Sequence, residues 1–162
     1  MSEESFVKAV YQSKDDKGLC SALKRADSSN LNFRCCEFLI KQGINIENEQ
    51  ERLTASVIAA SIARSKSTED GAFCLPRALA LCYMDNDENS AAKIKMRKLC
   101  SCNSVQDLVK VLGPILKLIN SRDVELNHTE LYKDIRSFKF DNSRERTKTH
   151  WMRQFFSENR NE

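Results

Sequence analysis

The sequence predicts an all-α protein made of two small helical bundles packed together. The 162 residues include only 4 Gly and 2 Pro, whereas the helix-favouring residues Leu, Ala, Lys, Glu and Arg are plentiful. Apolar residues recur at helical spacing through most of the chain, and no segment shows the alternation of a half-buried strand. A chain of this length can bury a core without disulfides or a metal ion.

Four helical patterns occupy the first part of the chain. Residues 3–13 and 15–27 each place apolar side chains on one stripe, so two short helices are expected there. Asn32 is expected to cap a third helix, which should end at Gly43, a residue suited to the position just past a helix C-terminus. The longest uninterrupted pattern, 49–65, carries alanines that allow neighbouring helices to approach closely.

The most polar part of the chain lies near its middle and marks the expected domain boundary. Residues 66–84 open as a polar loop and turn helical near Pro76, which is tolerated in the first turn of a helix. The connector 84–90, with the sequence MDNDENS, then separates the two bundles. We therefore predict an N-terminal bundle over 1–86 and a C-terminal bundle over 87–162.

The second bundle opens with basic and amphipathic helical patterns. Residues 91–102 place apolar side chains at helical spacing among lysines and an arginine. Ser104 with Asp107 resembles a capping box, which predicts the start of another helix. Pro114 should kink that helix or split it, because proline lacks the N–H that a helix interior uses. A further helix is expected over 128–138.

The last helix is expected to start near Ser143 and to run through the only tryptophan, Trp151. A terminal segment usually frays unless its apolar side chains are buried. Trp151 and Phe155 lie one turn apart, so we expect them to close the C-terminal bundle against Phe138 and the helix around Leu116.

The cysteines do not form a metal or disulfide pattern. There are 7, with close pairs of the form CC at 35–36 and CxC at 100–102, whereas structural zinc sites use C-x₂₋₄-C pairs, often with histidine. An odd count favours small, reduced core residues. A metal- or thiol-dependent enzyme is the least favoured hypothesis, since it would rest on these cysteines alone.

Other enzyme signatures are absent from the sequence. It has no nucleophile elbow, no HExxH, no P-loop and no dinucleotide fingerprint. His128 could contribute to a helix start and His150 lies on a polar stripe, and the sequence shows no positioned partners of the kind that catalysis needs for either. We therefore expect a non-enzymatic protein with no catalytic residue, no cofactor and no metal ion.

The sequence also favours a location in the cytoplasm. No apolar run reaches the roughly 18 residues that a membrane helix needs. The N-terminus, MSEESFVKAV, is acidic and lacks the apolar segment of a signal peptide. We expect no membrane partner.

Charge is distributed unevenly along the chain. Up to Glu88 there are 11 Lys and Arg against 14 Asp and Glu, and from Asn89 there are 15 against 9. The basic second part contains clusters at 93–98 and 144–148, which could bind phosphates. No motif for reading base edges occurs, so sequence-independent contact with nucleic acid is favoured.

The end of the chain, ERTKTHWMRQFF, resembles the closing motif of the CasB family, the small subunits of the type I-E CRISPR Cascade complex. That motif has the form Arg-x-x-Trp-Ala-Arg-x-Phe-Tyr. The residues that fall on it here are Trp151, Arg153, Phe155 and Phe156, with Met152 in place of Ala and Phe156 in place of Tyr. Three earlier segments also resemble segments of this family and occur in the same order along the chain: 18–27, 75–84 and 130–141.

The resemblance implies a non-catalytic helical subunit, present in two copies stacked head to tail. The other implied partners are the Cascade backbone and large subunits, the crRNA–target DNA duplex and the displaced non-target DNA strand. R-loop formation is nearly balanced in energy, so backbone contacts can favour it. Candidate contacts lie in the similar segments, in the basic clusters or on polar helix faces: Arg25, Arg52, Arg77, Lys93, Arg97, Lys98, Lys110, Arg144 and Arg146.

A second hypothesis is a helical protein–protein adaptor whose solvated basic faces meet acidic partners. Binding of nucleic acid at moderate salt would distinguish the two. Arg153 shares a polar stripe with Arg146, and we expect it to be structural rather than a nucleic-acid ligand.

Overall fold

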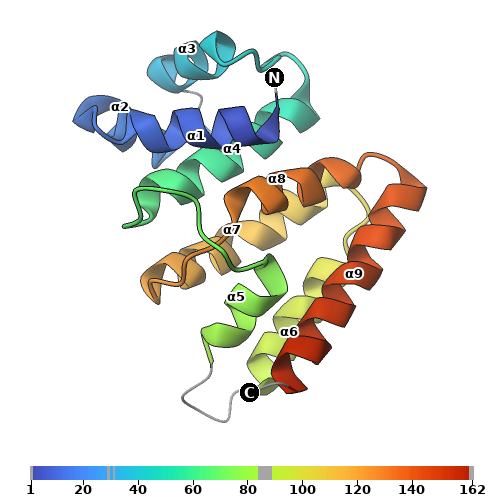
Figure 1. The fold of residues 1–162 in the computed structure, drawn as a ribbon. Helices are drawn as coiled ribbons and strands as arrows, with labels where there is room; N and C mark the ends of the chain where they lie inside the picture. The colour runs from blue at the N-terminus through green and yellow to red at the C-terminus, as the bar shows by residue number, and fades with distance from the viewer. Residues whose placement is uncertain (1, 29, 31, 84–88, 161–162) are drawn as a thin grey trace.

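The computed structural model describes residues 2–28, 30, 32–83 and 89–160, and within them it confirms the all-α prediction (Figure 1). The helices are α1 (Glu3–Ser13), α2 (Lys17–Leu23), α3 (Phe33–Lys41), α4 (Glu49–Arg64), α5 (Leu75–Leu81), α6 (Asn89–Cys100), α7 (Val105–Ser121), α8 (His128–Ser137) and α9 (Asp141–Arg160). In the described part of the chain, the β-type pairing is one isolated bridge between Phe73 and Leu126.

Local side-chain contacts begin and end several helices as the sequence predicts. The Asn32 side chain accepts hydrogen bonds from two backbone N–H groups in the first turn of α3. Ser104 Oγ accepts a hydrogen bond from Asp107 N at 3.1 Å at the start of α7. Gly43 has a φ of 83°, a conformation open to glycine, and it follows the end of α3. These three predictions are confirmed.

The structure differs from the sequence prediction at two places in the C-terminal half. α7 runs without interruption from Val105 to Ser121, so Pro114 does not split this helix, whereas the alternative, a kink at Pro114, stays a prediction. Pro114 is exposed, and apolar residues on both sides of it are buried. Their packing holds the two parts of the helix together despite the missing N–H. α9 begins at Asp141, two residues before the predicted start at Ser143.

The helix α4 is the centre of the packing. Its residues 54–63 are all buried, and it contacts α1, α2, α7 and α8. Small side chains such as Ala55, Ala59 and Ala63 allow these neighbours to approach closely. Figure 1 shows α1–α4 at one end of the molecule and α5, α6 and α9 at the other, with α7 and α8 between them.

Residues from both predicted bundles contribute to one cluster of buried apolar side chains. The contacts of α4 with α7 and α8, of α1 with α8 and of α5 with α9 join helices from opposite sides of the predicted boundary. Residues 84–88, where that boundary is predicted, lie outside the described residues. The division into 1–86 and 87–162 therefore stays a prediction.

Trp151 holds the C-terminal helix against the rest of the protein. Its ring is fully buried, with its centroid 5.6 Å from that of Phe138, and Phe155 is buried as well. This confirms the predicted contact with Phe138, while contact with the helix around Leu116 stays a prediction. Trp151 Nε1 donates a hydrogen bond to Asp134 Oδ2 at 2.8 Å. Burying two such rings contributes several kcal/mol, at about 25 cal/mol per Å².

The Asp134 carboxyl should make the stability of this contact depend on pH. Burial raises its pKa from an ordinary value of 3.8 to about 7, although the hydrogen bond from Trp151 opposes the shift. The folded state then binds the proton more tightly than the unfolded chain does. The contribution of Asp134 to the free energy of unfolding should therefore fall as pH rises from about 4 to about 7, by about 1.4 kcal/mol per pH unit, and should be constant at higher pH.

Urea unfolding of the wild type and of Asp134→Asn at a series of pH values checks this prediction. The wild type should lose stability relative to the variant between about pH 4 and about pH 7. Asp15→Asn, at an exposed position, serves as a control and should follow the wild type. Parallel pH profiles for the wild type and Asp134→Asn would contradict the raised pKa.

Candidate nucleic-acid interface

The structure does not bring all the predicted phosphate contacts together on one surface. The exposed ones are Arg25, Lys93, Arg97, Lys98, Lys110 and Arg146, and the half-buried ones are Arg52, Arg77 and Arg144. Arg25 follows α2, at the opposite end of the molecule from α6 (Figure 1). The residues on α6 and α9 therefore have to be considered apart from the others.

α6 carries a dense group of exposed cations. Lys93 and Arg97 lie one turn apart, and Lys98 follows directly. None of the three forms an ion pair with another described residue. Lys95, in contrast, lies 5.6 Å from the centroid of the Tyr83 ring and belongs to the packing. Arg97 and Lys98 lie in the last turn of α6, where positive charge also stabilises the helix terminus.

α9 carries a second row of cationic and polar side chains. Arg146, His150 and Arg153 occupy positions i, i+4 and i+7, so they follow one face of the helix, and all three are exposed. Arg153 Nη2 lies 3.5 Å from His150 Nδ1. From the sequence, Arg153 is expected to have a structural role, which stays a prediction, but because its side chain is exposed we treat it as a candidate contact as well.

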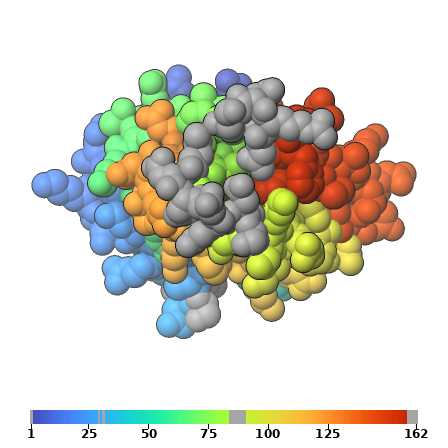
Figure 2. Space-filling model, turned by 90° about the horizontal axis from the view of Figure 1, so that it is seen from below, coloured from blue at the N-terminus to red at the C-terminus, as the bar shows by residue number. Residues whose placement is uncertain are grey.

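The two groups lie at the same end of the molecule because α6 and α9 are neighbours. Figure 1 and Figure 2 both show α6, in yellow-green, beside α9, in red. Side chains from both helices line a groove between them. Of the exposed cations, Lys93 and Arg97 line this groove, whereas Arg146 and Arg153 line a separate hollow together with Glu145. We call the exposed cations of the two helices the α6–α9 surface: Lys93, Arg97, Lys98, Arg146 and Arg153.

Arg144 and Lys148 hold α9 onto the loop between α6 and α7. Arg144 donates hydrogen bonds to Asn103 O at 3.0 Å and to Asp141 Oδ1 at 2.7 Å, and its side chain is only 14% exposed. Lys148 is buried, and its Nζ donates to Asn103 Oδ1 at 2.8 Å and lies 6.0 Å from the centroid of the Phe138 ring. Because protein contacts occupy its guanidinium, we leave Arg144 out of the α6–α9 surface.

The other predicted contacts lie on different elements. Arg52 on α4 donates to Ile46 O at 2.9 Å, and Arg77 on α5 is half-buried and has a neighbouring partner. Arg25 follows α2, and Lys110 is exposed on α7. Contact of these four cations with nucleic acid stays a prediction.

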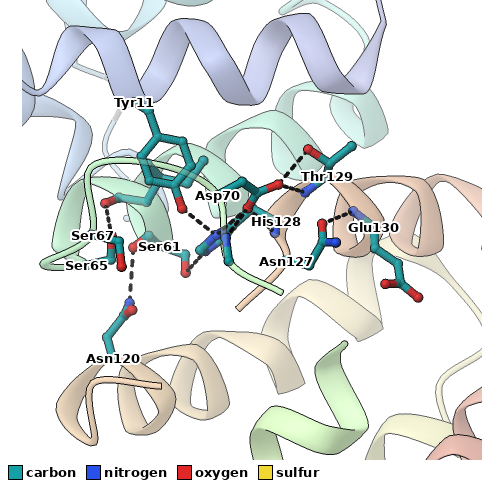
Figure 3. Close-up of polar contacts among 12 residues, drawn as sticks. Tyr11, Ser61, Ser65, Ser67, Asp70, Asn120, Asn127, His128, Thr129 and Glu130 are labelled. Atoms are coloured by element: carbon teal, nitrogen blue, oxygen red, sulfur yellow. Dashed lines mark hydrogen bonds and ion pairs between the residues drawn. The ribbon is translucent and has the colours of Figure 1, made fainter. Parts of the chain in front are cut away.

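A buried polar network joins α1, α4 and α8 (Figure 3). At its centre is His128, the first residue of α8, which is 2% exposed. Its Nδ1 lies 3.1 Å from Tyr11 Oη on α1, and its Nε2 lies 2.8 Å from Ser61 Oγ on α4. Both ring nitrogens therefore have partners, as a buried imidazole requires.

Asp70 completes this network from the loop between α4 and α5. Its carboxylate accepts hydrogen bonds from His128 N at 2.7 Å and from Thr129 N and Oγ1 at 3.1 and 2.7 Å. Burial raises the pKa of Asp70, but the hydrogen bonds from His128 and Thr129 outweigh burial, and the pKa lies below its ordinary value. The negative charge at the N-terminus of α8 stabilises that helix.

Lys14 fixes the loop that carries Asp70. Its Nζ donates hydrogen bonds to the carbonyl oxygens of Ile62, Ser65 and Ser67, at 3.1, 2.6 and 2.7 Å. Ser65 and Ser67 follow the end of α4, and the ammonium group gives their carbonyl oxygens a partner, whereas the Ile62 carbonyl also accepts from Ser65 N. Burial lowers the pKa of Lys14. α1 thus positions the loop, and the loop positions the start of α8.

Ser61, His128 and Asp70 have the chemistry of a hydrolase triad but not its exposure. A nucleophile and its base must border a pocket that a substrate can enter. Ser61 and His128 are each 2% exposed, and the Asp70 carboxylate is engaged by the first backbone N–H groups of α8. The network therefore joins helices and holds no accessible nucleophile.

The cysteines behave mainly as core residues. All 7 are free thiols, and Cys35, Cys82 and Cys102 are buried. Burial raises the pKa of each of these three thiols and so disfavours the reactive thiolate. The described residues contain no group of three His, Cys, Asp or Glu able to hold a metal ion.

Within the same residues, no helix combines the length and apolar character needed to cross a membrane.

Removing the Tyr11 hydroxyl tests the buried network. Tyr11→Phe keeps the ring but leaves Nδ1 of the buried His128 without this partner. We expect the free energy of unfolding in urea to fall by about 1–2 kcal/mol. Tyr132→Phe is a matched control, because Tyr132 is also buried but borders a surface pocket and has no hydrogen bond with a described residue through its hydroxyl. Equal losses for the two variants would contradict a stabilising Tyr11–His128 hydrogen bond.

The family model described as CRISPR-associated protein Cse2 matches residues 20–156. No curated protein and no solved structure matches the chain. The matched range covers most of the chain and includes every residue of the α6–α9 surface.

Proposed function

This chain belongs to the CRISPR-associated Cse2 family, the small subunits of the type I-E Cascade complex, and from that premise we propose that it holds the R-loop. Membership makes the chain a subunit of a CRISPR complex of antiviral defence, in agreement with the resemblance of its C-terminal motif. The proposed role is to stabilise the crRNA–target DNA duplex and the displaced DNA strand, in the cytoplasm, by contacts that do not depend on base sequence.

The observation that carries this proposal is the exposed α6–α9 surface. Lys93, Arg97 and Lys98 are exposed and make no ion pair with another described residue. Lys and Arg side chains of this kind bind phosphates without reading bases. Because the guide RNA reads the target by base pairing, a subunit that binds only the backbone can favour R-loop formation at any target sequence.

We further propose that the subunit is not catalytic. Its one Ser–His–Asp arrangement among the described residues is buried and serves to join helices. The buried thiols have raised pKa values, which disfavours cysteine chemistry. No cofactor is needed for a role that consists of binding.

The proposed protein partners are the Cascade backbone and large subunits and a second copy of this chain. α3 offers a surface suited to such contacts, because Phe33 is 86% exposed and Ile40 is 55% exposed. These two residues lie seven positions apart and so share one face of the helix. Exposed apolar side chains on one face are typical of a surface that is covered in an assembly.

Neutralising the cations of α6 should weaken the hold of the assembled complex on target DNA. We expect the combined variant Lys93→Gln, Arg97→Gln and Lys98→Gln to bind target DNA more weakly than the wild type. The slope of log affinity against log salt concentration should become shallower by about 2–3, since each lost phosphate contact removes about 0.7–0.9. Equilibrium binding to target DNA over a range of salt concentrations measures both quantities.

A second combined variant, Lys8→Gln, Lys17→Gln and Lys133→Gln, provides the control. It removes the same charge from exposed positions on α1, α2 and α8, and it should leave the salt slope near that of the wild type. An unchanged affinity and slope for the α6 variant would contradict the proposal. If instead the α6 variant enters the complex less readily than the wild type, while the complexes that do incorporate it bind DNA normally, the adaptor hypothesis would be favoured.

A further inference from the structure

The groove between α6 and α9 is apolar and has a cationic rim. Its volume is about 200 Å³. Met96 and Phe155 are buried beneath it, while Met152 and Phe156, 42% and 50% exposed, form one wall. The charged side chains that line it, among the described residues, are Lys93 and Arg97. An exposed aromatic ring thus lies beside two exposed cations that form no ion pair with another described residue, a combination suited to binding a ligand that is both flat and anionic.

Phe156 is held in place from within the protein. Its ring meets that of Phe155 edge to face, with the centroids 5.2 Å apart and an angle of 83° between the planes. Phe155 is 1% exposed, so the supporting ring is fixed in the core. The aromatic face of Phe156 is therefore presented by a rigid base, which lowers the entropy lost when a flat group stacks on it.

The groove also continues the row of cations along α9. Phe156 follows Arg153 by three positions, which makes them neighbours on the helix surface, and Arg153 follows His150 and Arg146 along the same face. A row of cations that ends at an exposed aromatic ring, beside an apolar groove, is the arrangement with which proteins bind single-stranded nucleic acid. The cations follow the phosphates, and the ring receives a base.

We propose that this groove receives one unstacked base of a single-stranded nucleic acid, with Phe156 as the stacking surface. Lys93 and Arg97 would contact the phosphates on either side of that base. Among the described residues the walls are mainly apolar, and the uncharged polar group that lines them is the weakly hydrogen-bonding thiol of Cys100, so bases of every kind would enter, in keeping with sequence-independent binding. The inference rests on the proposed function, because the single strand whose base enters the groove would be the displaced DNA strand of the R-loop.

A protein partner fits the same groove less well. A docked helix presents a long row of apolar side chains at i, i+3, i+4 and i+7, whereas the groove has the volume of a single small group. Its rim carries Lys93 and Arg97, which form no ion pair with another described residue and match a phosphate on each side of a base. We therefore assign the groove to nucleic acid and treat binding of a protein as an outcome of the test.

The test compares two strands of roughly 12 nucleotides, within the range of known single-strand sites. One is fluorescein-labelled oligothymidylate, and the other has the same length but abasic sugars throughout. The full-length wild-type chain should bind the strand with bases more tightly than the abasic strand. Phe156→Ala should weaken binding of oligothymidylate about tenfold and leave binding of the abasic strand unchanged. Fluorescence anisotropy at equilibrium measures both affinities.

Two further variants separate stacking from other effects. Phe156→Leu keeps an apolar side chain but lacks the aromatic face, and it should lose affinity as Phe156→Ala does. Phe33→Ala removes a more exposed ring from α3 and should bind both strands as the wild type does. The salt slope should stay the same in all three variants, because none of them removes a phosphate contact.

The outcomes distinguish this inference from the proposed function. If the wild type binds both strands equally and Phe156→Ala changes neither affinity, the base-binding groove is refuted while backbone binding stands. If the wild type binds neither strand at low salt, the proposed function fails along with the inference. A Phe156→Ala variant that loses self-association in sedimentation, with unchanged oligonucleotide binding, would assign the groove to a protein contact and also refute the inference.

Discussion

The arrangement of the helices depends on a buried imidazole. His128 contacts the hydroxyls of Tyr11 and Ser61, and the Asp70 carboxylate accepts the backbone N–H of the same residue, so α1, α4 and the loop after α4 all meet at the start of α8. A buried polar group without partners costs about 1–3 kcal/mol, and this packing therefore favours the one arrangement in which every partner is present. Apolar packing alone tolerates small shifts of a helix, whereas this set of hydrogen bonds does not.

Contacts made by α8 also fix the positions of the helices that carry the proposed binding surface. Asp134 on α8 accepts the hydrogen bond of Trp151, and Phe138 at the end of α8 packs against the same indole, so the position of α8 fixes that of α9. Arg144 and Lys148 then bind α9 to Asn103, in the loop that follows α6. The exposed cations of α6 and α9 are thus carried on helices whose positions are set by buried contacts. A surface with fixed positions loses less entropy on binding a strand than mobile side chains on a loop would.

The sequence was sufficient for the parts of the structure that depend on local chemistry. Helical periodicity located the helices, Asn32 and Ser104 were recognised as caps, and Trp151 was identified as the anchor of α9 because a large ring near a terminus needs a buried site. The basic clusters of α6 and α9 were visible as runs of charge. The sequence left open whether Pro114 would kink α7 or split it, since the outcome depends on packing along the whole helix rather than on proline itself.

What the sequence left open depends on contacts between distant residues. Tyr11, Ser61, Asp70 and His128 come from separate parts of the chain, and no spacing relates them, so the network appeared only when the fold was known. The same is true of Arg144, which in the sequence is one more cation of a basic cluster but in the structure binds Asn103. Exposure and pairing, rather than the density of charge, decide which cations are available to a ligand.

Photocrosslinking within the assembled complex tests the central claim most directly. Ile94 is 50% exposed on α6, beside Lys93 and one turn from Lys98, and Ile40 is similarly exposed on α3. A photoreactive phenylalanine analogue at position 94 should crosslink to DNA when the R-loop forms, and the same group at position 40 should crosslink to protein. Crosslinks from position 94 to protein alone would contradict the assignment of this surface to nucleic acid.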